Sequence, residues 1–394
     1  MDSSTDAKTE ASTGLGDSSI TRTAPALVTV IIPNHNYGDF VGAAIDSALA
    51  LDWPAVEVIV VDDGSSDHSR QVISAYGERV LAVFQDNSGQ SVACNTGFAK
   101  SSGEIIIFLD SDDLLEPTLI KDLMAVWRPG ISKVQFQMQF VDADGKATGD
   151  VFPHYHVVPS AAQVRRWART AAAYPTPPGS GNAYSRSFLR SIFPLDGQDR
   201  ASDTYCLAAA PYLGDVLTIA KPLVMYRVHG RNQGARSRLS AARFSVDVRR
   251  AQFRFRYGQA AAHTVGIPVD DSALQRSLTF LPYRLASLKL SPSTHPIGDD
   301  TVPKVLTDLV FACFTPQGVP VRSRAALCVW ATSVALAPSA LGSRLLLWRF
   351  APSSRPDTLK RAMRALGILR RTTRAEPAAR TRGLWASIQR AIGP

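Results

Sequence analysis

Cysteine is scarce in this chain of 394 residues, which holds only Cys94, Cys206, Cys313 and Cys328. They are far apart, none belongs to a C-x-x-C pair, and none stands with histidine at the spacing of zinc ligands. This pattern argues against a disulfide framework and against a structural zinc site. We therefore expect four reduced thiols.

The chain also lacks a G-x-x-x-x-G-K-[ST] loop and a G-x-G-x-x-G segment that joins a strand to a helix. These absences argue against P-loop phosphoryl transfer and against a dinucleotide-binding unit. Residues 1–24 lack the basic start and apolar stretch of a secretory signal, and their Ser, Thr, Asp and Gly content predicts a disordered tail. The whole chain, with 45% hydrophobic and 20% charged residues, has an ordinary globular composition.

Positive charge is sparse in the first part of the chain and plentiful in the second. Residues 1–230 carry 17 basic and 26 acidic side chains, whereas residues 231–394 carry 26 basic and 8 acidic ones. The acidic part suits a bound metal, and the basic part suits anionic lipid or phosphate. Few aromatic residues interleave with the basic ones and no nucleic-acid-binding motif is present, so nucleic acid is not an expected partner.

Short apolar runs alternate with helical patterns after residue 26. The runs are 27–32, 56–61, 80–84 and 105–109, and the helices are predicted near 38–50, 66–76, 90–100 and 117–127. Strands that are apolar on both faces predict a Rossmann-like α/β fold, with a mostly parallel sheet and helices on both faces. Beyond about residue 229 the pattern is Arg-rich and mainly helical. In such sheets ligands bind at the carboxyl ends of the strands.

Acidic side chains gather where two of these runs end. Asp62 and Asp63 follow one run, and Asp110, Asp112 and Asp113 follow another. Either cluster alone could be a tight turn with a helix cap. Crowded carboxylates repel one another, however, and Mg²⁺ or Mn²⁺ with its preference for hard oxygen ligands would offset that repulsion. A metal at such an edge would stabilise a departing nucleoside diphosphate.

The segments around these clusters carry a resemblance to a known family. VTVIIPNHNYGDFVGAAIDSAL, VEVIVVDDGSSD and DNSGQSVACNTGFAKSSGEIIIFLDSDDLL occur in order over residues 27–125. Weaker similarity continues through SGNAYSRSFLRSIFP, ASDTYCLAAAPYLG and KPLVMYRVHGRN. The sequence resembles the family 2 glycosyltransferases of the GT-A fold, of the non-processive bacterial type. The resemblance implies a catalytic domain over residues 25–235, followed by a helical, basic region over residues 236–394.

The resemblance also implies a role for each matching residue. The donor nucleotide is expected to contact Pro33, Asn34, His35, Asp63, Asp110, Asp112 and Arg227. A metal is expected on Asp112, Asp113 and His229, and Asp203 matches the acid that the family uses as general base on the acceptor hydroxyl. Cys94 replaces the arginine that many relatives have before Asn95, so no role is carried over at that position.

The implied function is metal-dependent transfer of a sugar from a nucleoside diphosphate donor, with a UDP-sugar favoured, to the hydroxyl of a saccharide or lipid-linked acceptor. Inversion at the anomeric carbon and a setting in surface polysaccharide or glycolipid assembly are part of the same expectation. One alternative is a catalytically inactive relative that acts as an assembly scaffold. Another is a phosphorylatable receiver module, in which the D-S-D-D cluster and the YRVH segment would have no place.

Membrane contact is a separate hypothesis. Residues 325–343 carry no charge, and residues 355–390 hold ten basic side chains against Asp357 and Glu376. The uncharged segment could be a buried helix, a transmembrane helix or an interfacial hairpin, the last being favoured. We expect a cytoplasmic protein that binds the inner face of the cell membrane peripherally. Residues 163–167, QVRRW, fit the Q-x-x-R-W signature of processive synthases, but they precede Asp203, so we interpret the match as chance.

Overall fold

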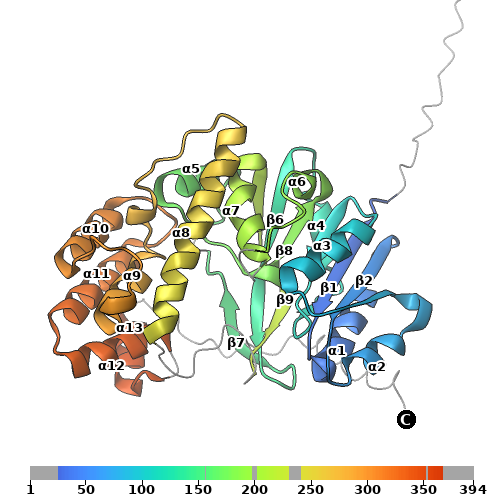
Figure 1. Cartoon of the computed structure of the whole chain (residues 1–394), viewed down its shortest axis with the longest axis horizontal. Coiled ribbons are helices and arrows are strands. Elements are labelled where there is room, and N and C mark those ends of the chain that lie inside the picture. Colours follow the sequence, from blue (N-terminus) through green and yellow to red (C-terminus); the bar gives the residue numbers. More distant parts are fainter. Residues whose placement is uncertain (1–24, 156, 198–201, 230–240, 352–353, 367–394) are drawn as a thin grey trace, which may run out of the picture.

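The computed structural model describes residues 25–155, 157–197, 202–229, 241–351 and 354–366 (Figure 1). The predicted tail at 1–24 and most of the basic segment at 355–390 lie outside these residues. One sheet runs through the described part, in the order β3-β2-β1-β4-β8-β6-β9-β5, with β7 paired to β6. Its strands are β1 (Val28–Asn34), β2 (Val56–Asp63), β3 (Leu81–Gln85), β4 (Ile105–Phe108), β5 (Leu114–Leu115), β6 (Ile131–Val141), β7 (Ala147–Phe152), β8 (Asn182–Ser185) and β9 (Asp215–Arg227).

The first four strands are mutually parallel, and they correspond to the four apolar runs. Their side chains alternate between two cores, because successive residues of a strand point to opposite faces. Val30 and Ile32 pack in one core with α1, whereas Ile31 packs in the other with α3. The predicted α/β class, with helices on both faces, is confirmed. The helices of this part are α1 (Gly38–Leu49), α2 (Ser69–Ser74), α3 (Gln90–Lys100), α4 (Leu119–Met124), α5 (Ala161–Ala171), α6 (Arg186–Arg190) and α7 (Asp203–Leu213).

The other side of the sheet is mixed. Strand β8 is antiparallel to both β4 and β6, and β6 is parallel to β9. Strand β9 is the longest strand among the described residues and includes two apolar stretches, 216–219 and 223–226. Strand β6 buries polar residues: the Gln135 side-chain nitrogen lies within hydrogen-bond distance of oxygen atoms of Tyr155, Pro175 and Thr218, and the Lys133 ammonium donates to Thr176. Satisfying these groups requires partners from distant parts of the chain.

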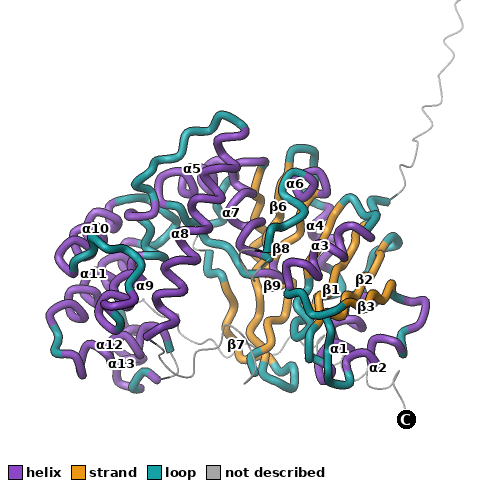
Figure 2. Tube along the Cα trace, viewed as in Figure 1, coloured by secondary structure: helices purple, strands orange, loops and turns teal. Residues whose placement is uncertain are grey.

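The predicted helical C-terminal region is also confirmed. It comprises α8 (Ala241–Thr264), α9 (Leu281–Leu290), α10 (Val302–Phe314), α11 (Val321–Leu336), α12 (Ser339–Phe350) and α13 (Asp357–Ala365). Figure 2 shows these helices gathered at one end of the molecule, with the strands at the centre and the other end. Helix α8 lies along the boundary, packed against both α7 and α9 (Figure 1).

This helical end has its own core, which includes Phe244, Leu285 and Leu309. The uncharged segment at 325–343 is divided between α11 and α12, which break at Ala337 and Pro338. Among the described residues, no helix combines the length and the apolar character needed to cross a membrane. The four cysteines are not joined by disulfides in this structure, and the Sγ atoms of Cys313 and Cys328 lie 2.9 Å apart.

Candidate functional site

The strands β1, β2 and β4 end at one edge of the sheet, and a cavity of about 1380 Å³ opens there. Its lining combines residues that follow these strands with residues of α7 and α8. The predicted site residues in its lining are Pro33, Asn34, His35, Asp63, Asp110, Asp112 and Asp203. Asp113, Arg227 and His229 are not in the lining. Arg227 and His229 contact Asp112, and Asp113 contacts Ser180.

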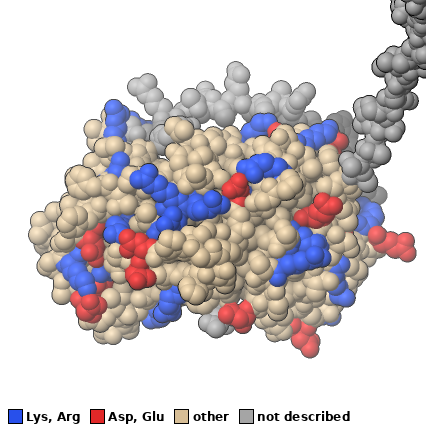
Figure 3. Space-filling model, turned by 90° about the horizontal axis from the view of Figure 1, so that it is seen from above, with Lys and Arg blue, Asp and Glu red and all other residues tan. Residues whose placement is uncertain are grey.

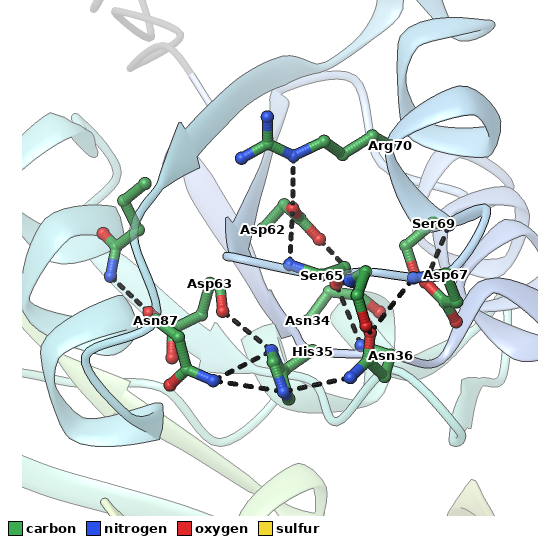
Figure 4. Close-up of polar contacts among 12 residues, drawn as sticks. Asn34, His35, Asn36, Asp62, Asp63, Ser65, Asp67, Ser69, Arg70 and Asn87 are labelled. Atoms are coloured by element: carbon green, nitrogen blue, oxygen red, sulfur yellow. Dashed lines mark hydrogen bonds and ion pairs between the residues drawn. The ribbon is translucent and has the colours of Figure 1, made fainter.

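The turns after β1 and β2 are tied together by side chains (Figure 4). The Asn34 amide donates to Asp62 and to the Ser65 hydroxyl, at 3.0 and 3.2 Å. Asn36, which has a left-handed backbone at φ 59°, accepts hydrogen bonds from the backbone amides of Ser66 and Asp67. Asn34 therefore joins the turn after β1 to the turn after β2 and also lines the cavity. Asn36 joins the same two turns, although its sequence position did not suggest that role.

Asp63 holds the loop between β3 and α3. One carboxylate oxygen accepts from the Gln85 amide and the Ser88 backbone N–H, and the other accepts from the Gly89 N–H at 2.7 Å. A carboxylate has about four acceptor sites, so one remains on the second oxygen for a ligand. Nδ1 of His35 lies 2.8 Å from the Asp63 carbonyl oxygen, which fixes the imidazole at the cavity wall.

Ser180 fastens the acidic segment after β4 to the loop before β8. Its hydroxyl accepts from the Asp110 N–H at 3.0 Å and donates to Asp113 at 2.7 Å. The second Asp113 oxygen accepts from the Arg227 N–H at 3.1 Å, so both oxygens of this buried carboxylate already have donors. Asp113 therefore positions its neighbours rather than facing the cavity.

The carboxylates of Asp110 and Asp113 are buried close to other carboxylates, and the nearby positive charge does not offset their repulsion. Burial, together with repulsion from Asp112 and Asp203, raises the pKa of Asp110 to about 7. Burial and repulsion from Asp112 and Asp110 raise the pKa of Asp113 well above its ordinary value. Gly179 allows the close approach here, since a Cβ at that position would lie 2.9 Å from an Asp110 oxygen. A bound cation would offset this excess of negative charge.

The side chains of His229 and Asp112 form a pair, and Asp112 lines the cavity. The His229 Nε2 atom lies 3.0 Å from an Asp112 oxygen, and the imidazole stacks on the Phe40 ring at 4.5 Å. The Arg227 guanidinium is turned to main-chain carbonyls, donating to Asp112 at 3.0 Å and to Ala143 at 2.7 Å. The Arg227 side chain therefore helps to hold the backbone of the acidic segment 110–113 in place.

A carboxylate and an imidazole are donors that Mn²⁺ accepts in proteins. Within the described ranges, no group of three or more His, Cys, Asp and Glu side chains is arranged to hold a metal. The pair Asp112 and His229 nevertheless fits a metal that takes its other ligands from a diphosphate, because such ions commonly use one or two protein ligands plus substrate phosphate.

Asp203 is the first residue of α7 and contacts the loop that carries Ser180. It lines the cavity, and one of its oxygens accepts from the Gly179 N–H at 3.3 Å. Cys94 is a fully buried residue of α3 that faces the core, and burial raises the pKa of its thiol to about 12. It therefore takes no part in the cavity surface.

Sequence comparison identifies relatives of this chain. Residues 29–193 match the model of the family described as Glycosyl transferase family 2. An uncharacterized glycosyltransferase of Nostoc sp. is 34% identical over 212 residues, which are 52% of this chain and 66% of that protein. The uncharacterized glycosyltransferase YibD of Escherichia coli is 36% identical over 102 residues, which are 25% of this chain and 30% of that protein. In neither case does the match reach two thirds of the relative's length.

Solved structures show a broader likeness. TarS 1–349 of S. aureus in complex with UDP-GlcNAc has a TM-score of 0.49 and 16% identity, over 82% of this chain and 91% of that one. The mannosyltransferase PcManGT of Pyrobaculum calidifontis in complex with GDP-Man and Mn²⁺ has a TM-score of 0.46 and 18% identity, over 82% and 86% of the two chains.

Proposed function

Because the chain belongs to glycosyl transferase family 2, we propose that it moves a sugar from a nucleoside diphosphate donor to an acceptor hydroxyl. The observation that carries the proposal is that Asp63, Asp112 and Asp203, from three separate segments, line one cavity at the carboxyl edge of the sheet. A UDP-sugar is the favoured donor, and a saccharide or lipid-linked molecule in surface polysaccharide or glycolipid assembly is the proposed acceptor.

The donor would lie along the edge formed by β1, β2 and β4. The remaining acceptor site on the Asp63 carboxylate would take an N–H of the base, with Pro33 and His35 beside it. Asp110, held by Gln90 and Ser180, would meet the ribose. Asp112 and His229 would hold Mn²⁺ or Mg²⁺, with Asp113 and Arg227 supporting them. When bound, such an ion supplies positive charge for the departing diphosphate.

Asp203 is the proposed general base. It would take the proton of the acceptor hydroxyl as that oxygen attacks the anomeric carbon, and the bond to the nucleoside diphosphate breaks on the other side. A single displacement of this kind inverts the anomeric configuration. A base must lie within hydrogen-bond reach of the proton it removes, and Asp203 on the cavity wall supports that role.

Calorimetric titration of UDP, GDP and dTDP into the full-length protein tests the donor site. With Mn²⁺ present we expect UDP to bind, and with EDTA we expect the affinity to fall by about 10-fold or more, because the positive charge that Asp112 and His229 would hold near the diphosphate is removed. Equal affinity with and without metal would contradict the metal assignment. If no nucleotide binds under either condition, the scaffold alternative takes the place of the enzyme.

Peripheral binding to the inner face of an anionic membrane is the proposed location. Large apolar side chains are exposed on two helices of the basic end, with Phe311 at 66%, Phe314 at 80% and Leu336 at 79%. On the face shown in Figure 3, basic side chains stand in separate groups with acidic ones among them, so charge alone gives no continuous membrane-binding surface there. The apolar side chains of α10 and α11 would insert beside basic residues such as Arg322.

Vesicle sedimentation tests this location. The full chain is expected to bind phosphatidylglycerol vesicles more tightly than phosphatidylcholine vesicles, because charge and apolar insertion act together. Phe311→Ser with Phe314→Ser should weaken binding by about 10-fold or more, since each ring loses about 1.5–3 kcal/mol of burial. Val157→Ser, which changes a residue 79% exposed in the loop before α5, is the matched control. Binding that ignores both lipid charge and the two rings would refute the proposal.

A further inference from the structure

The wall of the cavity that faces the sheet edge is made by α8. The α8 residues that line the cavity are Arg243, Val246, Asp247, Arg250 and Arg254. Their spacing of three and four residues places them on one face of the helix. The cavity therefore has one wall from the family's strand ends and another from a helix that begins at Ala241, beyond the matched residues 29–193.

The two walls carry opposite charge. The strand ends contribute Asp63, Asp110 and Asp112, whereas the α8 face contributes three guanidinium groups against the single carboxylate of Asp247. Guanidinium groups bind phosphate and carboxylate in a bidentate way, which gives geometry as well as affinity. The α8 face is thus suited to an anion, and the strand ends are suited to a cation.

The positive wall lies next to the proposed base. A terminal nitrogen of Arg254 is 3.4 Å from the Thr204 hydroxyl, and Thr204 follows Asp203. The Arg254 Nε is buried and has no hydrogen-bond partner among the residues that the structure describes. A buried polar group without a partner is costly, and an anionic ligand in the cavity would relieve that cost.

We infer that the α8 face binds an anionic group of the acceptor, a phosphate or a carboxylate, and so presents the acceptor hydroxyl to Asp203. This inference rests on the proposed function, because it assigns the acceptor end of the same cavity. The donor diphosphate is assigned to the other wall, where Asp112 and His229 would reach it through a metal.

The test uses the full-length protein and three small probes: glucose 6-phosphate, glucuronate and uncharged glucose. Each probe is titrated with and without saturating nucleotide. We expect one of the two anionic probes to bind and glucose not to bind, and the anion that binds distinguishes phosphate from carboxylate. In Arg243→Gln with Arg250→Gln, the affinity for that probe should fall by about 10-fold or more, while the affinity for nucleotide stays within about 2-fold.

Arg249→Gln with Arg256→Gln is the matched control, since both residues are exposed on α8 and neither lines the cavity. This variant should bind the anionic probe as the wild type does. The inference is overturned if neither anion binds, if both double variants behave alike, or if nucleotide affinity falls instead of probe affinity. Failure of every nucleotide to bind contradicts the proposed function, but the titration without nucleotide still measures the α8 face directly.

Discussion

Asp112→Asn is expected to reduce sugar transfer by about 10³-fold, which corresponds to about 4 kcal/mol of transition-state stabilisation. The change removes a negative charge but keeps the shape of the side chain. Asp112 is the acid of the segment that both lines the cavity and lies 3.0 Å from His229 Nε2. Nucleotide binding in Mn²⁺ should weaken in parallel, and it should become insensitive to EDTA. Product formation and calorimetry measure the two effects.

Two further variants separate chemistry from folding. Asp52→Asn alters an exposed carboxylate that pairs with Lys121 on the surface, and we expect both activity and stability to be unchanged. Asp113→Ala should lower the free energy of unfolding by about 2 kcal/mol, because the buried Arg227 N–H and Ser180 hydroxyl lose their acceptor. Wild-type turnover in Asp112→Asn would remove the metal from the proposed mechanism.

Asp203→Asn is expected to lower kcat by about 10²–10⁴-fold while leaving nucleotide affinity unchanged, because an amide cannot take the acceptor proton. The Asn oxygen can still accept from the Gly179 N–H, so the loop should keep its position. Transfer assays with the donor and calorimetry with the nucleotide give the two quantities. A parallel loss of nucleotide binding would instead indicate that Asp203 shapes the donor end.

Asp357→Asn is a suitable control for that variant. Asp203 and Asp357 each occupy the first position of a helix, α7 and α13, so both substitutions remove a negative charge from a helix N-terminus. Any general effect on helix stability should appear in both. A fall in kcat that is confined to Asp203→Asn would therefore report on the reaction.

The parallel part of the fold was predictable, because strands buried on both faces give uninterrupted apolar runs. The same runs located Asp63, Asp110 and Asp112 at strand ends. Strand β6 was not predicted, since Lys133 and Gln135 bury polar groups whose partners come from distant segments. Long-range hydrogen bonds of this kind leave no local pattern in the sequence.

Side-chain roles that depend on tertiary contacts also could not be predicted from the sequence. Asp113 and Arg227 lie near the cavity as predicted from the sequence motifs. The sequence could not indicate that Asp113 contacts Ser180, or that the Arg227 guanidinium contacts main-chain carbonyls. Phe40 stacks on His229 across a large separation in the chain. The sequence could not show which arginines of α8 line the cavity and which face solvent. Nothing local distinguishes Arg250, which lines the cavity, from the exposed Arg249.

The shared cavity has an evolutionary consequence. The stretch of α8 that lines the cavity packs through Phe244 into the core of the helical end, which is distinct from the core that joins β1 to α1. A substitution on the cavity face of α8 therefore alters one wall without disturbing a strand or the turns that hold Asp63 and Asp112. Under the proposed function, relatives that differ in a few residues of this helix are expected to glycosylate different acceptors while using the same activated sugar.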